Sequence, residues 1–281
     1  MLLALLEALE RELPAALELR RELHAQPELA HAEHQTAARV AAALPVPATT
    51  VAGTGLAALI AGGPGAPVAL RAELDALPIR ERTGASFSAS GEAMHACGHD
   101  VHMAALVALT RAAHSLTEAL PAPLLAIFQP SEEAYPSGAE ELARGALADF
   151  APRAIVAAHI HPELAWGSVG LDPGIVNASC DAIEIVIEGT PTHGAYPHLG
   201  RDPVLALAEV VVALHAQLAR RINPLNPVVL TIGQLQAGSA ENVIPARATA
   251  RGALRAYRVE DRRALAELTA EVVSGVAGAT G

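Results

Sequence analysis

The sequence of 281 residues contains no lysine, and all 19 of its basic residues are arginine. This absence excludes mechanisms that need a lysine amine, including Schiff-base and pyridoxal phosphate chemistry, a P-loop lysine and a serine–lysine dyad. Aromatic residues are scarce, with one tryptophan, three tyrosines and three phenylalanines, and the formal net charge is −11. A nucleic-acid-binding protein needs a basic surface and stacking rings, so nucleic acid is excluded as a partner.

Cysteine is also scarce, because Cys97 and Cys180 are the two in the sequence. They are too few for a disulfide-stabilised secreted scaffold. The N-terminal segment MLLALLEALEREL lacks a basic region and a small-residue cleavage site, which favours an amphipathic surface helix over a targeting signal. No uninterrupted apolar run approaches the roughly 18 residues that span a bilayer. We therefore expect a soluble cytoplasmic protein that does not bind membranes.

The first 177 residues alternate short apolar runs, bounded by glycine or proline, with helical segments. Alternation of this kind predicts an α/β domain whose mostly parallel sheet is flanked by helices. Pro14 is expected to split or bend the first helix. Helices are expected over 2–23, 33–44, 101–120 and 139–148, and strands over 55–60, 68–74, 124–128 and 154–158.

The pattern changes near residue 178, where polar and apolar residues begin to alternate along a longer strand. The remaining residues predict the order β-α-β-β-α, which is one strand short of a split βαβ sandwich. The expected elements are strand 181–188, helix 202–221, strands 228–236 and 247–257, and helix 260–274. We therefore expect a second, smaller α/β domain over 178–281.

The densest group of reactive side chains lies between residues 94 and 102. It contains three histidines, Cys97 and Asp100. Cys97 and His99 are separated by one glycine, so both can turn towards the same ion. Thiolate and imidazole suit Zn²⁺ and related divalent metals. Asp100 would orient a ligand histidine by accepting a hydrogen bond from the ring nitrogen that does not bind the metal. This segment predicts a metal site without indicating its reaction.

Further acidic and histidine residues follow the predicted strands. Asp75 ends the strand 68–74, and Glu132 and Glu133 lie just beyond the strand 124–128. His159 and His161 follow the next strand, and the spacing alone does not choose between them. Ligands bind outside the carboxyl ends of parallel strands, so these groups are expected at one edge of the sheet. There one carboxylate can bind metal while its neighbour handles the proton of a water molecule.

Six segments stand out in order along nearly the whole chain: RRELHAQPE (20–28), RAELDALP (71–78), HACGHD (95–100), QPSEE (129–133), HGAYPH (193–198) and ENVIP (241–245). Together they resemble the M20 metallopeptidase family, specifically its amidohydrolase branch of hippurate hydrolases and N-acyl-amino-acid hydrolases. The resemblance implies a zinc-exopeptidase-like catalytic domain over 1–177 and a lid or dimerisation domain over 178–281.

The resemblance also implies roles for particular residues. It implies that Glu132 is the general base and that His193 reaches the substrate across a homodimer. Asn242 would hold the substrate carboxylate, and Arg255 is a further candidate for that task. Two divalent ions per subunit, manganese or zinc, are implied, and their ligands would be Cys97, His99, Glu133 and His159.

The expected activity is hydrolysis of the amide bond of N-acyl amino acids such as hippurate, giving a carboxylate and a free amino acid. The alternatives are a metal-dependent dipeptidase or carboxypeptidase of the same superfamily, and a non-catalytic metal-binding remnant. Family members continue for longer than this sequence. The resemblance therefore implies that the catalytic domain lacks its returning C-terminal segment and the lid domain its last strand. A further metal-binding histidine would be missing with them, unless His161 or another residue replaces it.

Overall fold

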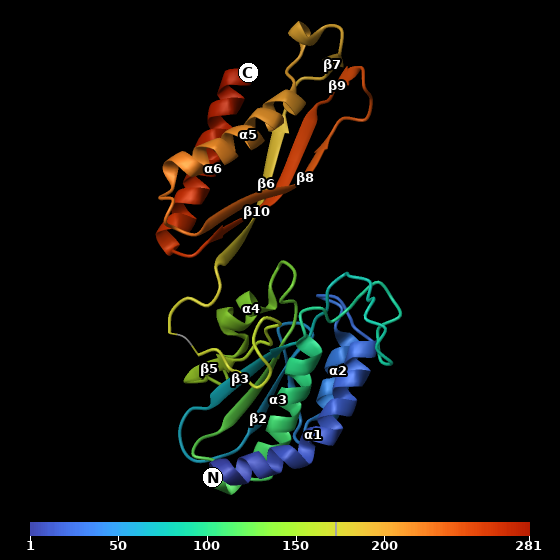
Figure 1. Ribbon diagram of the computed structural model, residues 1–281, viewed down its shortest axis with the longest axis vertical. Helices are drawn as coiled ribbons and strands as arrows, with labels where there is room; N and C mark the ends of the chain where they lie inside the picture. Colours follow the sequence, from blue (N-terminus) through green and yellow to red (C-terminus); the bar gives the residue numbers. More distant parts are fainter. Residues whose placement is uncertain (172) are drawn as a thin grey trace. The chain divides into compact units, whose positions relative to one another are not determined.

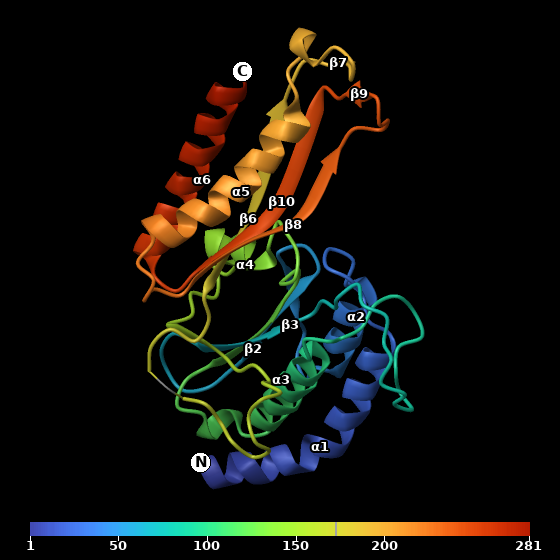
Figure 2. The same ribbon diagram turned by 45° about the horizontal axis from the view of Figure 1, so that its top comes forward.

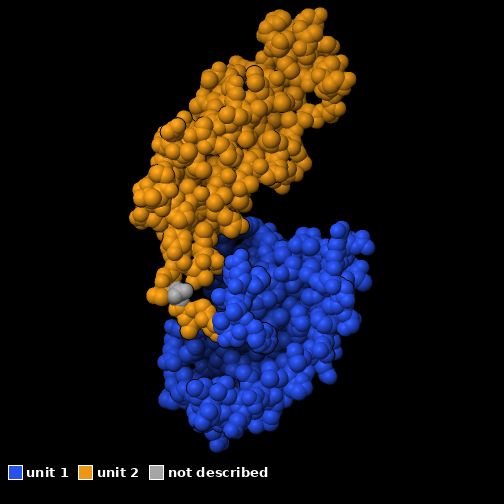
Figure 3. Space-filling view, in the orientation of Figure 1, with its two compact units in different colours: residues 1–168 blue, residues 169–281 orange. Residues whose placement is uncertain are grey.

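The computed structural model describes residues 1–171 and 173–281. Within these residues the chain forms two compact units, which are shown in different colours in Figure 3. Unit 1 comprises Met1–Ser168 and unit 2 comprises Val169–Gly281, whereas the sequence suggested a division between residues 177 and 178. Each unit has its own sheet and its own hydrophobic core, and each is described by itself.

Unit 1 is built on a five-stranded sheet with the order β1-β2-β4-β3-β5 (Figure 1). β3 pairs in parallel with β4 and β5, and β2 pairs antiparallel with β1 and β4. The predicted α/β class is confirmed, and the parallel strands point their carboxyl ends to one edge. β1 was not predicted, because three residues are too few to show a periodic pattern. The strands are Thr49–Val51 (β1), Gly55–Ile60 (β2), Val68–Glu73 (β3), Leu124–Gln129 (β4) and Ala154–Ala157 (β5).

Different layers bury the two faces of this sheet, because side chains along a strand alternate between faces. In β4, Ala126 and Phe128 pack with the long helices, while Leu125 and Ile127 pack with the short ones. Figures 1 and 2 show α1, α2 and α3 grouped on one side of the sheet. The helices are Leu2–Ala25 (α1), His34–Ala43 (α2), His99–His114 (α3), Thr117–Ala119 (η1), Gly138–Glu141 (α4) and Leu142–Ala146 (η2).

Three helices of unit 1 differ from the prediction. α1 continues through Pro14 as one helix, so the expected split does not occur. A proline removes one backbone donor, and the rest of this long helix still packs along α3. The helix expected over 101–120 ends at His114. The helix expected over 139–148 is broken into α4 and η2, where Gly145 has a φ of 136° that a regular helix does not allow.

Unit 2 contains a three-stranded antiparallel sheet with the order β6-β10-β8, and both of its long helices pack against one face. This arrangement agrees with the predicted order β-α-β-β-α. A two-stranded ribbon of β7 and β9 extends beyond the sheet (Figure 1). The elements are Ser179–Glu188 (β6), Thr192–His193 (β7), Pro197–Leu199 (η3), Pro203–Arg221 (α5), Val228–Ala237 (β8), Val243–Ile244 (β9), Arg247–Ala256 (β10) and Val259–Thr280 (α6).

α5 begins with an N-cap that fixes its start. The Asp202 carboxylate accepts hydrogen bonds from the backbone N–H groups of Val204 at 2.9 Å and Leu205 at 3.3 Å, and Pro203 occupies the first turn. Among the described residues, α5 alone has the length and composition of a membrane-crossing helix, a test that core helices of soluble proteins also pass. A helical stripe of α5 packs into the core of unit 2, namely Ala206, Leu207, Val210 and Leu214.

Candidate metal centre

The predicted site residues of unit 1 lie on loops where its parallel strands end. Asp75 follows β3, Glu132 and Glu133 follow β4, and His159 follows β5. Because β3 pairs in parallel with both β4 and β5, the three loops leave the same edge of the sheet. The edge at the carboxyl ends of parallel strands is where α/β proteins bind ligands.

Cys97 and His99 reach the same edge from the start of α3, because the glycine between them turns the chain. Gly98 is the N-cap of α3 and has a left-handed φ of 82°. A Cβ atom at this position would lie 2.0 Å from Cδ1 of Ile160. The left-handed backbone angle favours glycine here, and a side chain would also displace the end of Ile160.

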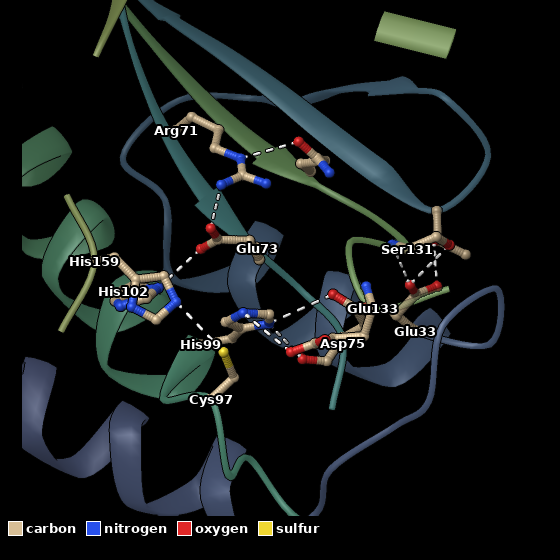
Figure 4. Close-up of polar contacts among 12 residues, drawn as sticks. Glu33, Arg71, Glu73, Asp75, Cys97, His99, His102, Ser131, Glu133 and His159 are labelled. Atoms are coloured by element: carbon tan, nitrogen blue, oxygen red, sulfur yellow. Dashed lines mark hydrogen bonds and ion pairs between the residues drawn. The ribbon is translucent and has the colours of Figure 1, made fainter. Parts of the chain in front are cut away.

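Atoms of the kinds that bind metals lie close together in this region (Figure 4). Sγ of Cys97 is 3.4 Å from Nε2 of His159, and Nε2 of His99 is 3.9 Å from Oε1 of Glu133. In two of the three groups found among the described residues, the ligand atoms come from predicted site residues and all lie within 4.8 Å of one another: Cys97 with His99 and His159, and His99 with Glu132 and Glu133. The structure therefore brings the four predicted ligands together, and His99 belongs to both groups.

The hydrogen bonding of His99 leaves one ring nitrogen available for a metal ion. Nδ1 donates to the backbone carbonyl oxygen of Asp75 at 2.8 Å, which places the lone pair on Nε2. Nε2 is buried and has no hydrogen-bond partner among the described residues. A buried polar atom without a partner is costly, and a metal ion would satisfy it. Thiol, imidazole and carboxylate donors together fit Zn²⁺ and related divalent ions.

The pKa values of the site show an excess of negative charge. Burial raises the pKa of Glu132, and the neighbouring Glu133 raises it further. Burial also raises the pKa of the Cys97 thiol to about 12, with a contribution from Glu133. Burial alone would lower the pKa of His99, but Asp75 is among the carboxylates that raise it. A divalent cation would neutralise this charge, and its binding to the thiol would release a proton.

Asp75 contacts two of the predicted ligands, Glu133 and His99. Its Oδ2 accepts a hydrogen bond from the backbone N–H of Glu133 at 2.8 Å, and its Oδ1 lies 3.5 Å from Nδ1 of His99. Burial would raise the pKa of Asp75, but hydrogen bonds from His99 and the backbone of Glu133 and Glu132 hold it below its usual value. These contacts are those of a residue that orients metal ligands.

A second buried pair, Glu73 and His102, supports His159 and was missed by the sequence analysis. Nδ1 of His102 is 2.8 Å from Oε2 of Glu73, and its Nε2 accepts the backbone N–H of Ile160 at 3.0 Å. The rings of His102 and His159 are in edge contact, with centroids 4.6 Å apart. Arg71 donates to Glu73 in turn. Both ring nitrogens of His102 are thus occupied within the protein, although its position also satisfies the spacing of a metal ligand.

A signal for His102 was present in the sequence. It follows His99 by three residues on α3, and residues three apart lie on the same face of a helix. His161, which the sequence left open beside His159, belongs to none of the ligand groups found in residues 1–171 and 173–281.

Asp100 does not have the role expected from the sequence. Its Oδ2 accepts from Nε of Arg20 at 2.7 Å and lies 2.9 Å from Nδ1 of His24, and neither residue is a predicted metal ligand. Successive side chains on a helix point about 100° apart, so Asp100 faces α1 while His99 faces the sheet edge. Asp100 therefore ties the start of α3 to α1.

In unit 2, the structure brings His193 and Asn242 together on the exposed β7–β9 ribbon. His193 is opposite Val243 in the pairing, and the backbone N–H of Gly194 donates to the Asn242 carbonyl oxygen at 2.7 Å. Nδ1 of His193 accepts the backbone N–H of Ala195 at 3.1 Å. This bond leaves Nε2 of His193 as the nitrogen that can donate a proton.

Arg255, the further candidate for binding the substrate carboxylate, is not placed beside Asn242 in unit 2. Arg255 lies near the end of β10, opposite Cys180 and Val229. Asn242 precedes β9, and β10 begins at Arg247, shortly after β9 ends at Ile244. A strand rises about 3.3 Å per residue, which separates Arg247 from Arg255 by about 26 Å.

The comparison with known families agrees with this geometry. The model of peptidase family M20/M25/M40 matches residues 69–276, and the chain belongs to this family. The match includes every predicted metal ligand of unit 1 and most of unit 2.

Several curated relatives act on N-acylated amino acids by name. The chain is 36% identical over 263 residues to N-acetyl-L-cysteine deacetylase of Bacillus subtilis (strain 168), covering 92% of this chain and 62% of the relative. It is 39% identical over 245 residues to N-acetyldiaminopimelate deacetylase of Bacillus licheniformis, covering 84% and 65%. It is 34% identical over 271 residues to N-acyl-L-amino acid amidohydrolase of Geobacillus stearothermophilus, covering 93% and 72%. The chain thus spans about two thirds of these proteins.

Solved structures show the same fold. A Staphylococcus aureus protein described as an aminohydrolase has a TM-score of 0.89 at 30% identity, covering 100% of this chain and 74% of its own. A Bacillus subtilis dinuclear metal-binding peptidase of the M20 family has a TM-score of 0.77 at 31% identity, covering 97% and 72%. The similarity therefore extends over both units.

Proposed function

We propose that this protein is a metal-dependent amidohydrolase that cleaves the amide bond of N-acyl amino acids, giving a carboxylate and a free amino acid. The observation that carries the proposal is the group of thiol, imidazole and carboxylate atoms around the unpartnered Nε2 of His99. The names of the curated relatives support an N-acylated amino acid as the substrate class.

In this proposal Cys97, His99, Glu133 and His159 hold two divalent ions, manganese or zinc. The description of one solved relative as dinuclear supports the number of ions. A divalent ion supplies Lewis acidity, which lowers the pKa of a bound water from ~15.7 towards ~7. Glu132 accepts the proton of the attacking water and passes it to the leaving amine nitrogen. The raised pKa of Glu132 helps the first of these transfers, because the conjugate base of a weaker acid accepts a proton more readily.

In the same proposal, His193 and Asn242 of unit 2 bind the substrate. His193 donates a hydrogen bond to the oxygen that becomes negatively charged as the amide is attacked. The side-chain amide of Asn242 binds the carboxylate of the amino-acid part of the substrate. Their closeness on β7 and β9 supports a joint action on one substrate.

The proposal includes a homodimer formed through unit 2 and a cytoplasmic location. β6 is an outer strand of its sheet, with one side unpaired among the described residues, and such an edge favours association. Light scattering that shows a monomer at micromolar concentration would reject the dimer. Cys97 forms no disulfide among the described residues, and a reducing compartment keeps a ligand thiol available. Cell fractionation tests the location.

The function is tested by measuring metal stoichiometry together with hydrolysis of three substrates, namely hippurate, an N-acetyl amino acid and a dipeptide. Turnover of the acylated amino acids with little activity on the dipeptide supports the amidohydrolase. The reverse preference would indicate a dipeptidase. Stoichiometric metal binding without turnover of any substrate would reject catalysis and leave a metal-binding protein.

Glu132→Gln separates the general base from the metal ligands. The amide cannot accept the water proton, so we expect kcat to fall on the order of 10³-fold, within the range of ~10²–10⁴ that a general base contributes. The bound metal, measured by atomic emission, should stay unchanged. Glu140→Gln is the control, because Glu140 is an exposed residue of α4 that pairs with Arg144. Unchanged hydrolysis by the Glu132 variant would reject the assigned base.

A further inference from the structure

Glu33, in the turn before α2, is a fully buried carboxylate that takes no part in the steps above. Its relative exposure is 0%. Oε1 accepts hydrogen bonds from the backbone N–H of Ser131 at 2.8 Å and from its Oγ at 3.2 Å, and Oε2 accepts from Oγ1 of Thr54 at 2.7 Å. Glu33 and Ser131 are 98 residues apart in the sequence, and Figure 4 shows them side by side. The carboxylate therefore ties the turn before α2 to the loop after β4.

The start of α2 does not account for the buried carboxylate. Glu33 occupies the N-cap position but makes no capping hydrogen bond with its side chain. Glu28 fulfils that task instead, because its carboxylate accepts from the backbone N–H groups of Gln35 at 3.2 Å and Thr36 at 2.7 Å. Burying a carboxylate is costly unless donors meet it, and most donors that meet Glu33 belong to the loop after β4.

The backbone of Ser131 is in a conformation that needs such support. Its φ of 50° lies in the left-handed region, which residues other than glycine rarely adopt and keep only when their surroundings impose it. The backbone N–H of His31 donates to Ser131 Oγ at 3.0 Å, and Gly138 N–H donates to its carbonyl oxygen at 3.2 Å. The bonds to Glu33 complete the set that holds this turn.

Two buried carboxylates hold the loop on either side of Glu132. Glu33 binds the N–H of Ser131 and Asp75 binds the N–H of Glu133, each at 2.8 Å. Glu132 lies between them and is exposed, so its own side chain is not packed in place. The direction of its carboxylate is thus set by the backbone on either side.

We propose that Glu33 is the positioning residue for Glu132. It fixes the backbone of Ser131 in the left-handed conformation, so that the next residue presents its carboxylate to the reacting water. The inference rests on the proposed amidohydrolase function and adds a residue to it. A displacement of about 1 Å in a reacting group can cost on the order of 10²-fold in rate. Loss of the tie should therefore lower kcat and leave substrate binding nearly intact.

The test compares Glu33→Ala, Glu33→Gln and the control Glu28→Ala in the full, metal-loaded chain. Glutamine keeps an oxygen for the Ser131 N–H, whereas alanine removes the acceptor. The control weakens the start of the same helix without touching the loop. The first readout is hydrogen exchange of the Ser131 amide, which needs no enzymatic activity. The second is kcat and KM with an N-acetyl amino acid, with folding checked by circular dichroism.

In Glu33→Ala we expect the Ser131 amide to exchange at least ~10-fold faster, because opening of the turn no longer breaks a bond to Glu33. We expect kcat to fall about 100-fold with KM within about 2-fold of the parent. Glu33→Gln should keep both values near the parent, and Glu28→Ala should change neither.

Unchanged exchange at Ser131 in Glu33→Ala, or an equal fall in kcat in Glu28→Ala, would overturn the proposal. If the alanine variant does not fold, Glu33→Asp replaces it, because the shorter side chain keeps the charge but withdraws the acceptor from Ser131. The same exchange and kinetic results are then required. A parent chain that hydrolyses none of the amides rejects the proposed function, and the exchange measurement still decides whether Glu33 holds the loop.

Discussion

The two units differ in how many acidic and histidine side chains they bury. Unit 1 buries eight acidic or histidine side chains, whereas in the described part of unit 2 the corresponding buried side chain is Asp261 alone. The buried residues of unit 1 are His24, Glu33, Glu73, Asp75, His95, His99, Asp100 and His102.

The candidate functional residues are therefore held in place differently in the two units. In unit 1, long-range hydrogen bonds orient the candidate ligands before any ion binds, as between Asp75 and Glu133 or His102 and Ile160. In unit 2, His193 and Asn242 are presented by an exposed ribbon that contributes little to the core. Substitutions in unit 1 should therefore affect folding and function together, while those on the ribbon should affect function alone.

Among substitutions that test this separation of folding from function, His193→Ala should change activity most. Loss of one donor to a developing oxyanion typically lowers kcat by ~10²–10³-fold. Because the side chain is exposed, the midpoint of urea unfolding should stay within experimental error. His198→Ala, at an exposed position in the short helix η3 that follows β7, is the control. A marked loss of stability in His193→Ala would contradict the separation of roles between the units.

The next effect concerns acid stability and His95. His95 is 3% exposed, and neither of its ring nitrogens has a hydrogen-bond partner among the described residues. Burial lowers its pKa to about 4 from the usual 6.5. Between these values the unfolded chain binds a proton that the folded chain does not, so stability falls as the pH falls from 6.5 to 4. A difference of about 2.5 pKa units corresponds to ~3 kcal/mol.

Urea unfolding at a series of pH values measures this loss. His95→Gln removes the titrating ring, and its unfolding free energy should vary less with pH across the same window. The slopes are compared rather than the absolute stabilities, because the glutamine also changes packing. Equal slopes for the parent and the variant would show that His95 is not the group that protonates on unfolding.

The smallest effect is expected for an ion pair on the surface of unit 2. Arg262 binds both carboxylate oxygens of Asp181, at 2.6 and 2.5 Å, and this hydrogen bonding lowers the pKa of Asp181. Its contribution is complete above the unfolded pKa near 3.9 and is lost as the pH falls through the lower folded value. Asp181→Asn should cost ~0.5 kcal/mol at neutral pH by urea unfolding. A cost above ~2 kcal/mol would show that this exposed pair behaves like a buried one.

The sequence predicted the site best where metal-binding residue types stand close together or just after a predicted strand. Cys97 and His99 stand in one short segment, and Glu133 and His159 each end an apolar strand, so their meeting at one sheet edge could be predicted from topology. The helices and longer strands of both units were likewise visible as periodic patterns. Elements of two or three residues, such as β1 and β7, have no period to detect.

The remaining features depend on contacts between distant segments. Glu33 and Ser131 are 98 residues apart, and nothing in the segment around Glu33 indicates which loop its carboxylate meets. Asp100 adjoins a predicted ligand in the sequence, yet the rotation of the helix turns it to Arg20. Arg255 lies at the end of β10 that is far from the ribbon, a separation that the length of the predicted strand 247–257 already implied. The sequence pattern shows which ionisable side chains are present, but the contacts between distant segments are defined by the folded structure.

The half-buried position of the Cys97 thiol affects its reactivity in the metal-free protein. With a pKa raised to about 12, it remains protonated at neutral pH, and a protonated thiol is a poor nucleophile. In the absence of a metal ion, alkylation at this position should therefore be slow. Burial and, after it, the neighbouring carboxylates suppress the thiolate, and the same carboxylates would favour a cation that stabilises it.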